Sequence, residues 1–131
     1  MARANILVVD DEPLIGEVFA DYLAEQGYAV TVSPNAFQAL ALAAGAAYDL
    51  IFLDIRMPEM DGVEALERMK VLQPAARFIL MTGYWDQTRH LLERAQKVGF
   101  FACVEKPFDL PELMPLIERA LAPGSSPEGG G

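Results

Sequence analysis

The sequence predicts a single α/β domain in which helices cover both faces of a five-stranded parallel sheet. Short apolar runs alternate with longer segments of helical spacing, which is the pattern of repeated strand–helix units. The 131 residues are enough for one hydrophobic core but not for two. An apolar content of 53% and a charged content of 22% are typical of a globular protein, so the composition argues against disorder.

Five apolar runs are the predicted strands. They are residues 6–9, 29–32, 50–53, 78–81 and 101–104. The first, third and fourth runs are apolar without alternation, which is expected of central strands that helices cover on both faces. The second run alternates more clearly and therefore suits the edge of the sheet.

The first two helices are predicted from their ends and their apolar spacing. The first opens at Pro13, a residue that suits a first turn, and ends at Gly27. The second runs over about residues 35–44 and ends at Gly45. The side chains that we expect to face the core are Leu14, Ile15, Val18, Phe19, Tyr22 and Leu23 in the first helix, and Phe37, Leu40 and Ala41 in the second.

The third and fourth helices each have a recognisable boundary. Asp61 is followed three residues later by Glu64, a capping-box spacing that predicts the start of the third helix. This helix ends before Pro74, because the residue before a proline disfavours helical geometry. The fourth helix is predicted to start near Asp86 and to end at Gly99.

The fifth helix has Asp109 as its predicted cap. Pro115 lies well inside it and lacks a backbone N–H, so we expect a kink or a delayed start. Residues 123–131 consist mostly of Gly, Ser and Pro and have little to bury. We therefore predict a domain over residues 1–122, followed by a flexible tail or linker over residues 123–131.

Charge and cysteine content exclude several classes of function. The formal net charge of −9 would repel nucleic acids and anionic lipids, so we expect no direct nucleic-acid contact and no membrane association. Apolar stretches fall short of the roughly 18 residues that cross a bilayer, and the start lacks a signal core, which favours the cytoplasm. The single Cys103 fits a reducing compartment and excludes a zinc site made of several thiolates.

Polar residues follow four of the five predicted strands. They are Asp10, Asp11 and Glu12 after the first, Asp54 after the third, Thr82 after the fourth, and Glu105 and Lys106 after the fifth. The carboxyl ends of parallel strands meet at one edge of the sheet, where α/β folds bind their ligands. One such aspartate alone is most often a turn former, but the combination predicts a site.

The predicted site suits a metal ion and a phosphoryl group. Converging carboxylates repel one another unless a cation neutralises them, and ligands that are all oxygen favour Mg²⁺, which often bridges to phosphate. Neither a serine nor a cysteine follows the central strand, so the candidate nucleophile is Asp54, which would form an acyl phosphate. Lys106 would pair with phosphoryl oxygens and the Thr82 hydroxyl would donate a hydrogen bond to them.

Four motifs together resemble the receiver domain of two-component response regulators. They are Asp10-Asp11, Asp54-Ile55-Arg56-Met57-Pro58-Glu59-Met60-Asp61-Gly62, Thr82-Gly83 and Lys106-Pro107-Phe108. The resemblance covers about residues 4–121. It implies a flavodoxin-like, doubly wound sheet in the order 2-1-3-4-5 with five helices. It also implies a phosphorylation-dependent switch, served by a sensor histidine kinase or a phosphotransfer protein.

The resemblance implies a role for each matching residue. Asp54 is the implied phosphoacceptor, and Thr82 and Lys106 are the implied switch pair. The implied Mg²⁺ ligands are Asp10, Asp11, Asp54 and the backbone carbonyl of Arg56. The bond between Lys106 and Pro107 is typically cis in this family. Such a domain is a phosphoacceptor rather than an enzyme, although it promotes its own phosphorylation and dephosphorylation.

The predicted output surface, made of the fourth helix, fifth strand and fifth helix, departs from the family pattern. Cys103 stands three residues before the lysine, where most receivers have an aromatic residue that swings inward. The segment between Thr82 and Lys106 is longer than the family norm by about half a helical turn, around Trp85. We therefore expect phosphorylation of Asp54 without the usual aromatic swing, and we consider Trp85 as an anchor for a partner or output domain.

One other function remains as an alternative, and two more are disfavoured by the sequence. A receiver-shaped interaction module that is never phosphorylated fits the altered output surface. A phosphatase that works through an aspartyl phosphate needs a second aspartate two positions after the nucleophile, where this chain has Arg56. A flavin-binding protein of the same fold needs a phosphate loop rich in hydroxyls and amides, whereas residues 10–13 are acidic.

Overall fold

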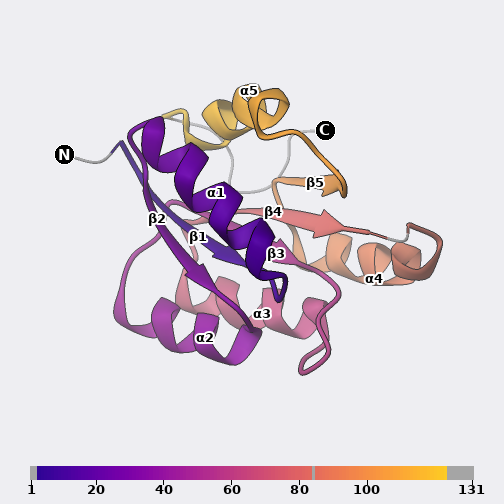
Figure 1. Ribbon diagram of the computed structural model, residues 1–131. Helices are drawn as coiled ribbons and strands as arrows, with labels where there is room; N and C mark the ends of the chain where they lie inside the picture. The colour runs from indigo at the N-terminus through magenta and orange to yellow at the C-terminus, as the bar shows by residue number, and fades with distance from the viewer. Residues whose placement is uncertain (1–2, 84, 124–131) are drawn as a thin grey trace.

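The computed structural model describes residues 3–83 and 85–123, with the side chains of residues 85–88 left out of the description. These residues form the predicted sheet of five parallel strands in the order β2-β1-β3-β4-β5 (Figure 1). The strands are β1 (Asn5–Val9), β2 (Ala29–Ser33), β3 (Leu50–Asp54), β4 (Arg77–Thr82) and β5 (Ala102–Glu105). The predicted fold class is confirmed, and each predicted run overlaps its strand.

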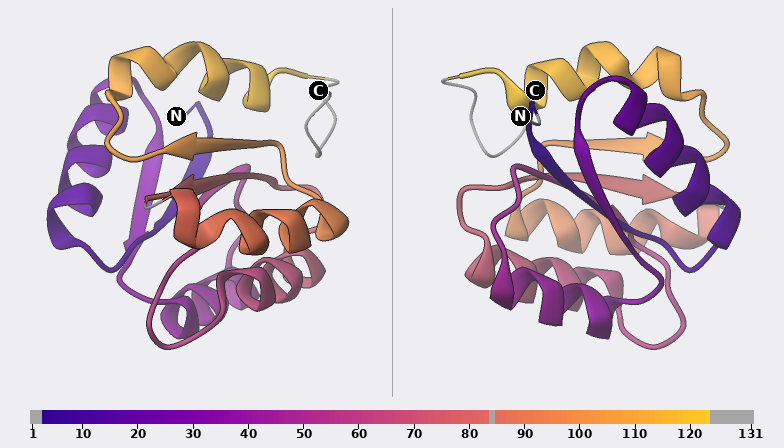
Figure 2. Two further views of the ribbon diagram at one scale, coloured as in Figure 1. Left: turned by 90° about the vertical axis from the view of Figure 1, so that its right-hand side faces the viewer. Right: turned by 60° about the vertical axis from the view of Figure 1, so that its left-hand side comes forward.

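Helices cover both faces of the sheet. One face carries α1 (Pro13–Glu25) and α5 (Leu110–Leu121), and the other carries α2 (Ala36–Gly45), α3 (Gly62–Leu72) and α4 (Trp85–Val98) (Figures 1 and 2). All five residues of β3 are buried, as expected of a central strand in a doubly wound sheet. Asp54, the last residue of β3, is therefore fixed by the most deeply packed strand of the domain.

The core has one layer on each side of the sheet. Alternate residues of one strand face opposite layers, so that Ile51 and Leu53 pack toward α2, α3 and α4, while Leu50 and Phe52 pack toward α1 and α5. The Phe52 ring lies 4.7 Å, centroid to centroid, from the ring of Phe19 in α1. Among the described residues, no helix is both long and apolar enough to span a membrane.

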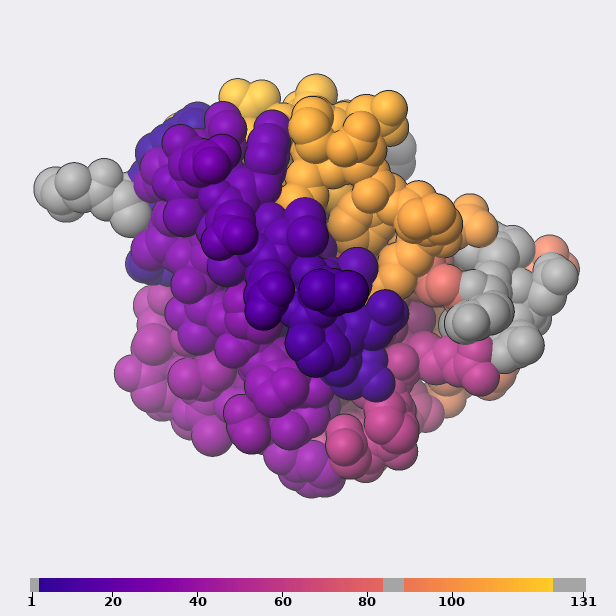
Figure 3. Space-filling view, in the orientation of Figure 1, coloured from indigo at the N-terminus to yellow at the C-terminus, as the bar shows by residue number. Residues whose placement is uncertain are grey.

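The predicted inward face of α1 is wrong for two of its six residues. Leu14 and Val18 are 74% and 56% exposed, whereas Phe19 and Leu23 are buried. The reason is the close approach of α1 to β2 at Gly16, where an added Cβ would lie 2.5 Å from Cγ1 of Val32. This contact turns Leu14 and Val18 outward. Figure 3 shows α1 spread across the front of the molecule beside the start of α5.

The predicted inward face of α2 is also wrong. Phe37 is 56% exposed and Ala41 is exposed, while Leu40 is only partly buried. The buried positions are instead three alanines, Ala36, Ala39 and Ala43. Their small side chains allow the helix to lie close to its neighbours, so the large apolar residues do not mark the inner face.

The helix ends follow most of the predicted signals. The side chain of Asn35 caps α2, and α3 begins after Asp61 as predicted. The delayed start of the fifth helix is wrong, because α5 begins at Leu110 directly after Asp109 and continues through Pro115. The cis bond between Lys106 and Pro107 is confirmed. The side chain of Trp85 and the tail from residue 124 onward lie outside the described residues.

Two side chains of α3 and α4 join these helices. Lys70 Nζ of α3 donates to the carbonyl oxygens of Val98 and Gly99, at 3.0 and 3.2 Å, and so satisfies acceptors at the C-terminal end of α4. Arg94 of α4 forms a 2.9 Å ion pair with Asp61, the cap of α3. Both contacts hold α4 against α3.

The loop from Asp54 to α3 is compact and leaves no room for a side chain at Gly62, the first residue of α3. Arg56 and Asp61 pair as an isolated antiparallel bridge. A Cβ at Gly62 would clash with the carbonyl oxygen of Ile55, which is backbone and cannot rotate away. The closeness of Gly62 to Ile55 therefore fixes the path of the chain that follows Asp54.

We predict that Gly62→Ala lowers the free energy of unfolding by about 1–3 kcal/mol, because the added methyl group forces the backbone of the loop to shift. The matched control is Gly45→Ala at the end of α2, where an added Cβ meets nothing within 4 Å. This control should leave the stability unchanged or raise it by up to about 1 kcal/mol. Urea unfolding measures both, and equal effects of the two substitutions would contradict the close contact.

We predict that Asp61→Ala costs about 0.5–2 kcal/mol at pH 7 and that this cost shrinks below about pH 4. Partial burial acts to raise the pKa of Asp61, but the Val63 N–H and Arg94 outweigh it and hold the pKa below its usual range. The stabilisation by the carboxylate is therefore complete above the unfolded-state pKa and is lost as the pH falls through the folded-state pKa. Urea unfolding across this pH range measures the loss.

The control for this prediction is Asp109→Ala at the start of α5. Asp109 occupies the same cap position but its side chain makes no capping hydrogen bond. The substitution should therefore cost clearly less than Asp61→Ala at pH 7. A cost of Asp61→Ala that is the same at pH 7 and pH 3 would disprove the role of the ionised carboxylate.

Candidate functional site

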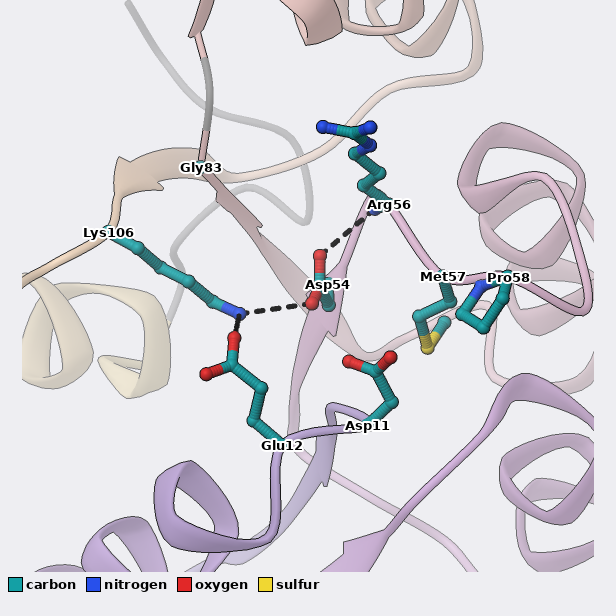
Figure 4. Close-up of a pocket in the computed structure, with 8 residues that line it drawn as sticks. All are labelled: Asp11, Glu12, Asp54, Arg56, Met57, Pro58, Gly83 and Lys106. Atoms are coloured by element: carbon teal, nitrogen blue, oxygen red, sulfur yellow. Dashed lines mark hydrogen bonds and ion pairs between the residues drawn. The ribbon is translucent and has the colours of Figure 1, made fainter.

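A pocket of about 660 Å³ lies at the carboxyl ends of the strands (Figure 4). Its lining residues are Asp11, Glu12, Asp54, Arg56, Met57, Pro58, Gly83 and Lys106. They come from the last residue of β3 and from the segments that follow β1, β3, β4 and β5. The structure thus brings together residues that are far apart in the sequence, at the edge where the sequence predicts a site.

Asp54 is 5% exposed and its two carboxylate oxygens have different partners. Oδ1 accepts a 2.9 Å hydrogen bond from the backbone N–H of Arg56, and Oδ2 accepts a 3.0 Å hydrogen bond from Lys106 Nζ. Burial raises the pKa of Asp54 and the nearby charge of Asp10 adds to this effect, while the two hydrogen bonds oppose it. The carboxylate is held in one orientation with an oxygen beside the pocket.

Asp10 is not among the residues that line the pocket, and its side chain is fully buried. Its Oδ1 accepts a 2.9 Å hydrogen bond from the backbone N–H of Glu12. Its Oδ2 lies 2.7 Å from Lys106 Nζ, but it accepts no hydrogen bond of good geometry from the described residues. A buried carboxylate oxygen without such a bond is suited to a cation as a ligand.

Lys106 is the shared partner of three carboxylates. Its Nζ lies 2.7 Å from Asp10, 3.0 Å from Asp54 and 3.1 Å from Glu12. Burial alone would lower the pKa of Lys106, but the close contact with Asp10, the hydrogen bond to Asp54 and the charges of both carboxylates outweigh it and raise the pKa above its usual range. Lys106 therefore stays charged and neutralises part of the acidic cluster.

The contact that Glu12 makes was not predicted from the sequence. The sequence shows it among the polar residues after the first strand, but gives it no role. In the structure its side chain reaches Lys106, which is 94 positions away along the chain. The signal for this contact was its place directly after Asp10-Asp11 at the end of a parallel strand, where ligand-binding side chains gather.

The carboxylates fit a hard divalent cation. Asp10, Glu12 and Asp54 each offer an oxygen, and these oxygens lie within 4.8 Å of one another. Asp11 lines the pocket but is exposed and is not part of this group, although the resemblance to receiver domains implies that it is a ligand. Arg56 also lines the pocket. A set of oxygen ligands without histidine or thiolate suits Mg²⁺ or Ca²⁺.

Thr82 does not line the pocket. It is fully buried at the end of β4, and its hydroxyl donates a long, 3.5 Å hydrogen bond to the carbonyl oxygen of Val104 in β5. The Cys103 thiol lies on the same side, with its Sγ 4.0 Å from Thr82 Oγ1. Burial raises the pKa of this thiol, and the charge of Glu105 adds to the effect. The hydroxyl thus faces β5 rather than Asp54.

The comparisons with known proteins agree with this geometry. Residues 6–118 match the family model described as "Response regulator receiver domain". The regulatory protein AtoC of Escherichia coli K12 is 40% identical over 117 residues, which are 89% of this chain but 25% of that protein. Sporulation initiation phosphotransferase F of Bacillus subtilis is 32% identical over 121 residues, covering 92% of this chain and 96% of that protein.

A solved structure supports the same assignment. A response regulator from Burkholderia pseudomallei, crystallised with a phosphorylated aspartic acid, a calcium ion and citrate, superposes with a TM-score of 0.78 at 29% identity. The match covers 93% of this chain and 68% of that chain. Fold, pocket and sequence thus agree, and the chain belongs to the family of response regulator receiver domains, the phosphorylation-dependent switches of two-component systems.

Proposed function

We propose that this receiver domain accepts a phosphoryl group on Asp54. The observation that supports the proposal is the position of this carboxylate. Asp54 ends the central strand, is held by the Arg56 N–H, and has the Lys106 ammonium 3.0 Å from its other oxygen beside an open pocket. A fixed oxygen nucleophile next to a cation and an accessible cavity is the arrangement that phosphoryl transfer requires.

The proposed reaction forms one bond and breaks one bond. A carboxylate oxygen of Asp54 attacks phosphorus, and the bond from phosphorus to the donor breaks. The donor leaves as a free histidine when it is a phosphohistidine, or as acetate when it is acetyl phosphate. Lys106 then pairs with the negative charge of the phosphoryl oxygens. The product is an acyl phosphate on Asp54.

A bound Mg²⁺ would supply charge neutralisation for the phosphoryl oxygens. We propose Asp10, Asp11, Asp54 and the backbone carbonyl of Arg56 as its ligands. The buried Asp10 Oδ2 without a well-formed hydrogen bond supports this assignment. The Burkholderia relative was crystallised with a phosphorylated aspartic acid and a calcium ion, and calcium also prefers oxygen ligands.

We propose that Thr82 completes the switch by turning its hydroxyl from β5 toward the phosphoryl group. Its 3.5 Å bond to the carbonyl oxygen of Val104 is long, so its loss costs little. Reversing a two-state equilibrium from 1:99 to 99:1 takes about 5.5 kcal/mol. Hydrogen bonds to charged groups contribute about 1.5–3 kcal/mol each, so new bonds from Thr82 and Lys106 supply most of that difference.

The proposed output runs through α4, β5 and α5. The half-buried Cys103 has its thiol sulfur 4.0 Å from Thr82 Oγ1, so among the described residues a thiol is the neighbour of the switch hydroxyl on β5. We therefore propose that movement of Thr82 is transmitted by small shifts of β4 and β5 rather than by an aromatic swing.

We propose a sensor histidine kinase or a phosphotransfer protein as the phosphoryl donor. The chain spans about a quarter of AtoC and nearly all of sporulation initiation phosphotransferase F, so relatives differ in whether further domains accompany the receiver. We propose residues 1–122 as the receiver domain, supported by the end of α5 at Leu121, with an output domain or separate protein as the target. We also propose that the protein is located in the cytoplasm.

We predict that the protein incubated with Mg²⁺ and acetyl phosphate gains the mass of one phosphoryl group. Asp54→Asn should abolish the gain, because an amide cannot form the acyl phosphate, and removal of Mg²⁺ with a chelator should suppress it. Intact-protein mass spectrometry at neutral pH measures both effects. Asp109→Asn, at an exposed carboxylate outside the pocket, is the matched control and should be phosphorylated normally.

Lack of a mass gain in the unaltered protein, under conditions in which another receiver reacts, would favour the alternative of an interaction module that is not phosphorylated. A gain that persists in Asp54→Asn would place the phosphoryl group on another residue. Either result would overturn the proposed role of Asp54.

A further inference from the structure

The ammonium group of Lys106 is shared among more anionic partners than the proposed reaction uses. Three carboxylate oxygens, from Asp10, Glu12 and Asp54, lie within 3.1 Å of Nζ, and an ammonium has three N–H donors. A phosphoryl group on Asp54 would bring a further set of acceptors to the same ammonium. It therefore competes with at least one carboxylate that Lys106 already contacts.

The three carboxylates are not equally free to give up this contact. The side chains of Asp10 and Asp54 are 0% and 7% exposed, and each accepts a hydrogen bond from a backbone N–H. The side chain of Glu12 is 61% exposed. Glu12 is therefore the partner that can hold or release the ammonium without rearranging the buried part of the site (Figure 4).

The carboxylate of Glu12 has no role in capping the helix that follows it. Glu12 occupies the cap position of α1, but its side chain makes no capping hydrogen bond. Its backbone contributes instead, since the Glu12 N–H donates to Asp10 and the Glu12 carbonyl accepts from Ile15 and Gly16. Replacing the side chain with glutamine would keep these backbone contacts and remove one charge.

We propose that Glu12 is a positioning residue that acts through Lys106: its carboxylate retains the ammonium in the unphosphorylated site and so opposes the phosphorylated state. This inference rests on the proposed function, because it concerns the partner that Lys106 leaves when Asp54 carries a phosphoryl group. A side chain at the mouth of the pocket then sets the balance between the unphosphorylated and the phosphorylated state.

The first test is the affinity for beryllofluoride, which mimics a phosphoryl group on a carboxylate, measured by calorimetry at saturating Mg²⁺. Glu12→Gln should bind beryllofluoride about fivefold more tightly. This factor corresponds to the interaction of two unit charges about 4 Å apart in water-like surroundings. The matched control is Glu17→Gln, which removes the same charge from an exposed position of α1 outside the pocket. It should leave the affinity unchanged. Unchanged or weaker binding by Glu12→Gln overturns the proposal.

The second test separates action through Lys106 from direct repulsion between Glu12 and the phosphoryl mimic. In a double-mutant cycle, Glu12→Gln is combined with Lys106→Met. If Glu12 acts by holding the ammonium, its substitution has no effect on beryllofluoride affinity once Lys106 is replaced. The same fivefold gain in the Lys106→Met background would show direct repulsion and refute the positioning role.

The third test does not depend on phosphorylation. In the metal-free protein, nitrogen-15 NMR of the lysine ammonium groups reports hydrogen exchange at Lys106 Nζ. Glu12→Gln should accelerate this exchange, whereas Glu17→Gln should not. No acceleration would refute the retention of the ammonium by Glu12. Acceleration in a protein that binds no beryllofluoride would instead refute the proposed function and leave the resting contact established.

Discussion

The arrangement of this domain depends on one constraint, which is the need to neutralise carboxylates that a parallel sheet brings to the same edge. Asp10 and Asp54 end up buried there because β1 and β3 are central strands covered on both sides. Buried carboxylates are costly unless a cation accompanies them. Lys106 provides that cation from the far end of the chain, and so ties β5 to β1 and β3.

The same constraint makes the site responsive. A carboxylate cluster with one ammonium keeps a net negative charge, so it retains affinity for a further cation after Lys106 has formed its contacts. A phosphoryl group changes the number and position of the negative charges, and the ammonium redistributes among them. Packed strands and helices have few alternative arrangements, so a local change in charge selects between discrete states rather than causing a gradual distortion.

Much of the fold was predictable because it depends on patterns that lie close together in the sequence. The apolar runs located the strands, and Asp61 with Glu64 located the start of α3. The order of the strands came from the resemblance to a family and not from the runs. Two residues of α1 and the inward face of α2 were mispredicted because close approaches at Gly16 and at three alanines, rather than side-chain size, decide which side is buried.

The sequence was sufficient to predict which residues come together in the site, but not which of their atoms are in contact. Asp54 and Lys106 were expected near each other because both follow strands of one sheet. The direction of the Thr82 hydroxyl in the unphosphorylated site, toward the Val104 carbonyl of β5, was not predicted, since a side-chain rotamer depends on neighbours that sequence spacing does not specify. The contact between Glu12 and Lys106 was missed for the same reason.

The contacts of Lys70 with the last carbonyl groups of α4 have a mechanical consequence. A helix of 14 residues is about 20 Å long, and it is fastened near its final turn. When a straight helix that is held near one end tilts, its other end moves furthest. In α4 the other end begins two residues after Gly83, which lines the pocket, and Arg94 holds the helix against α3 between the two ends, so a small tilt about these contacts displaces the end nearest the pocket.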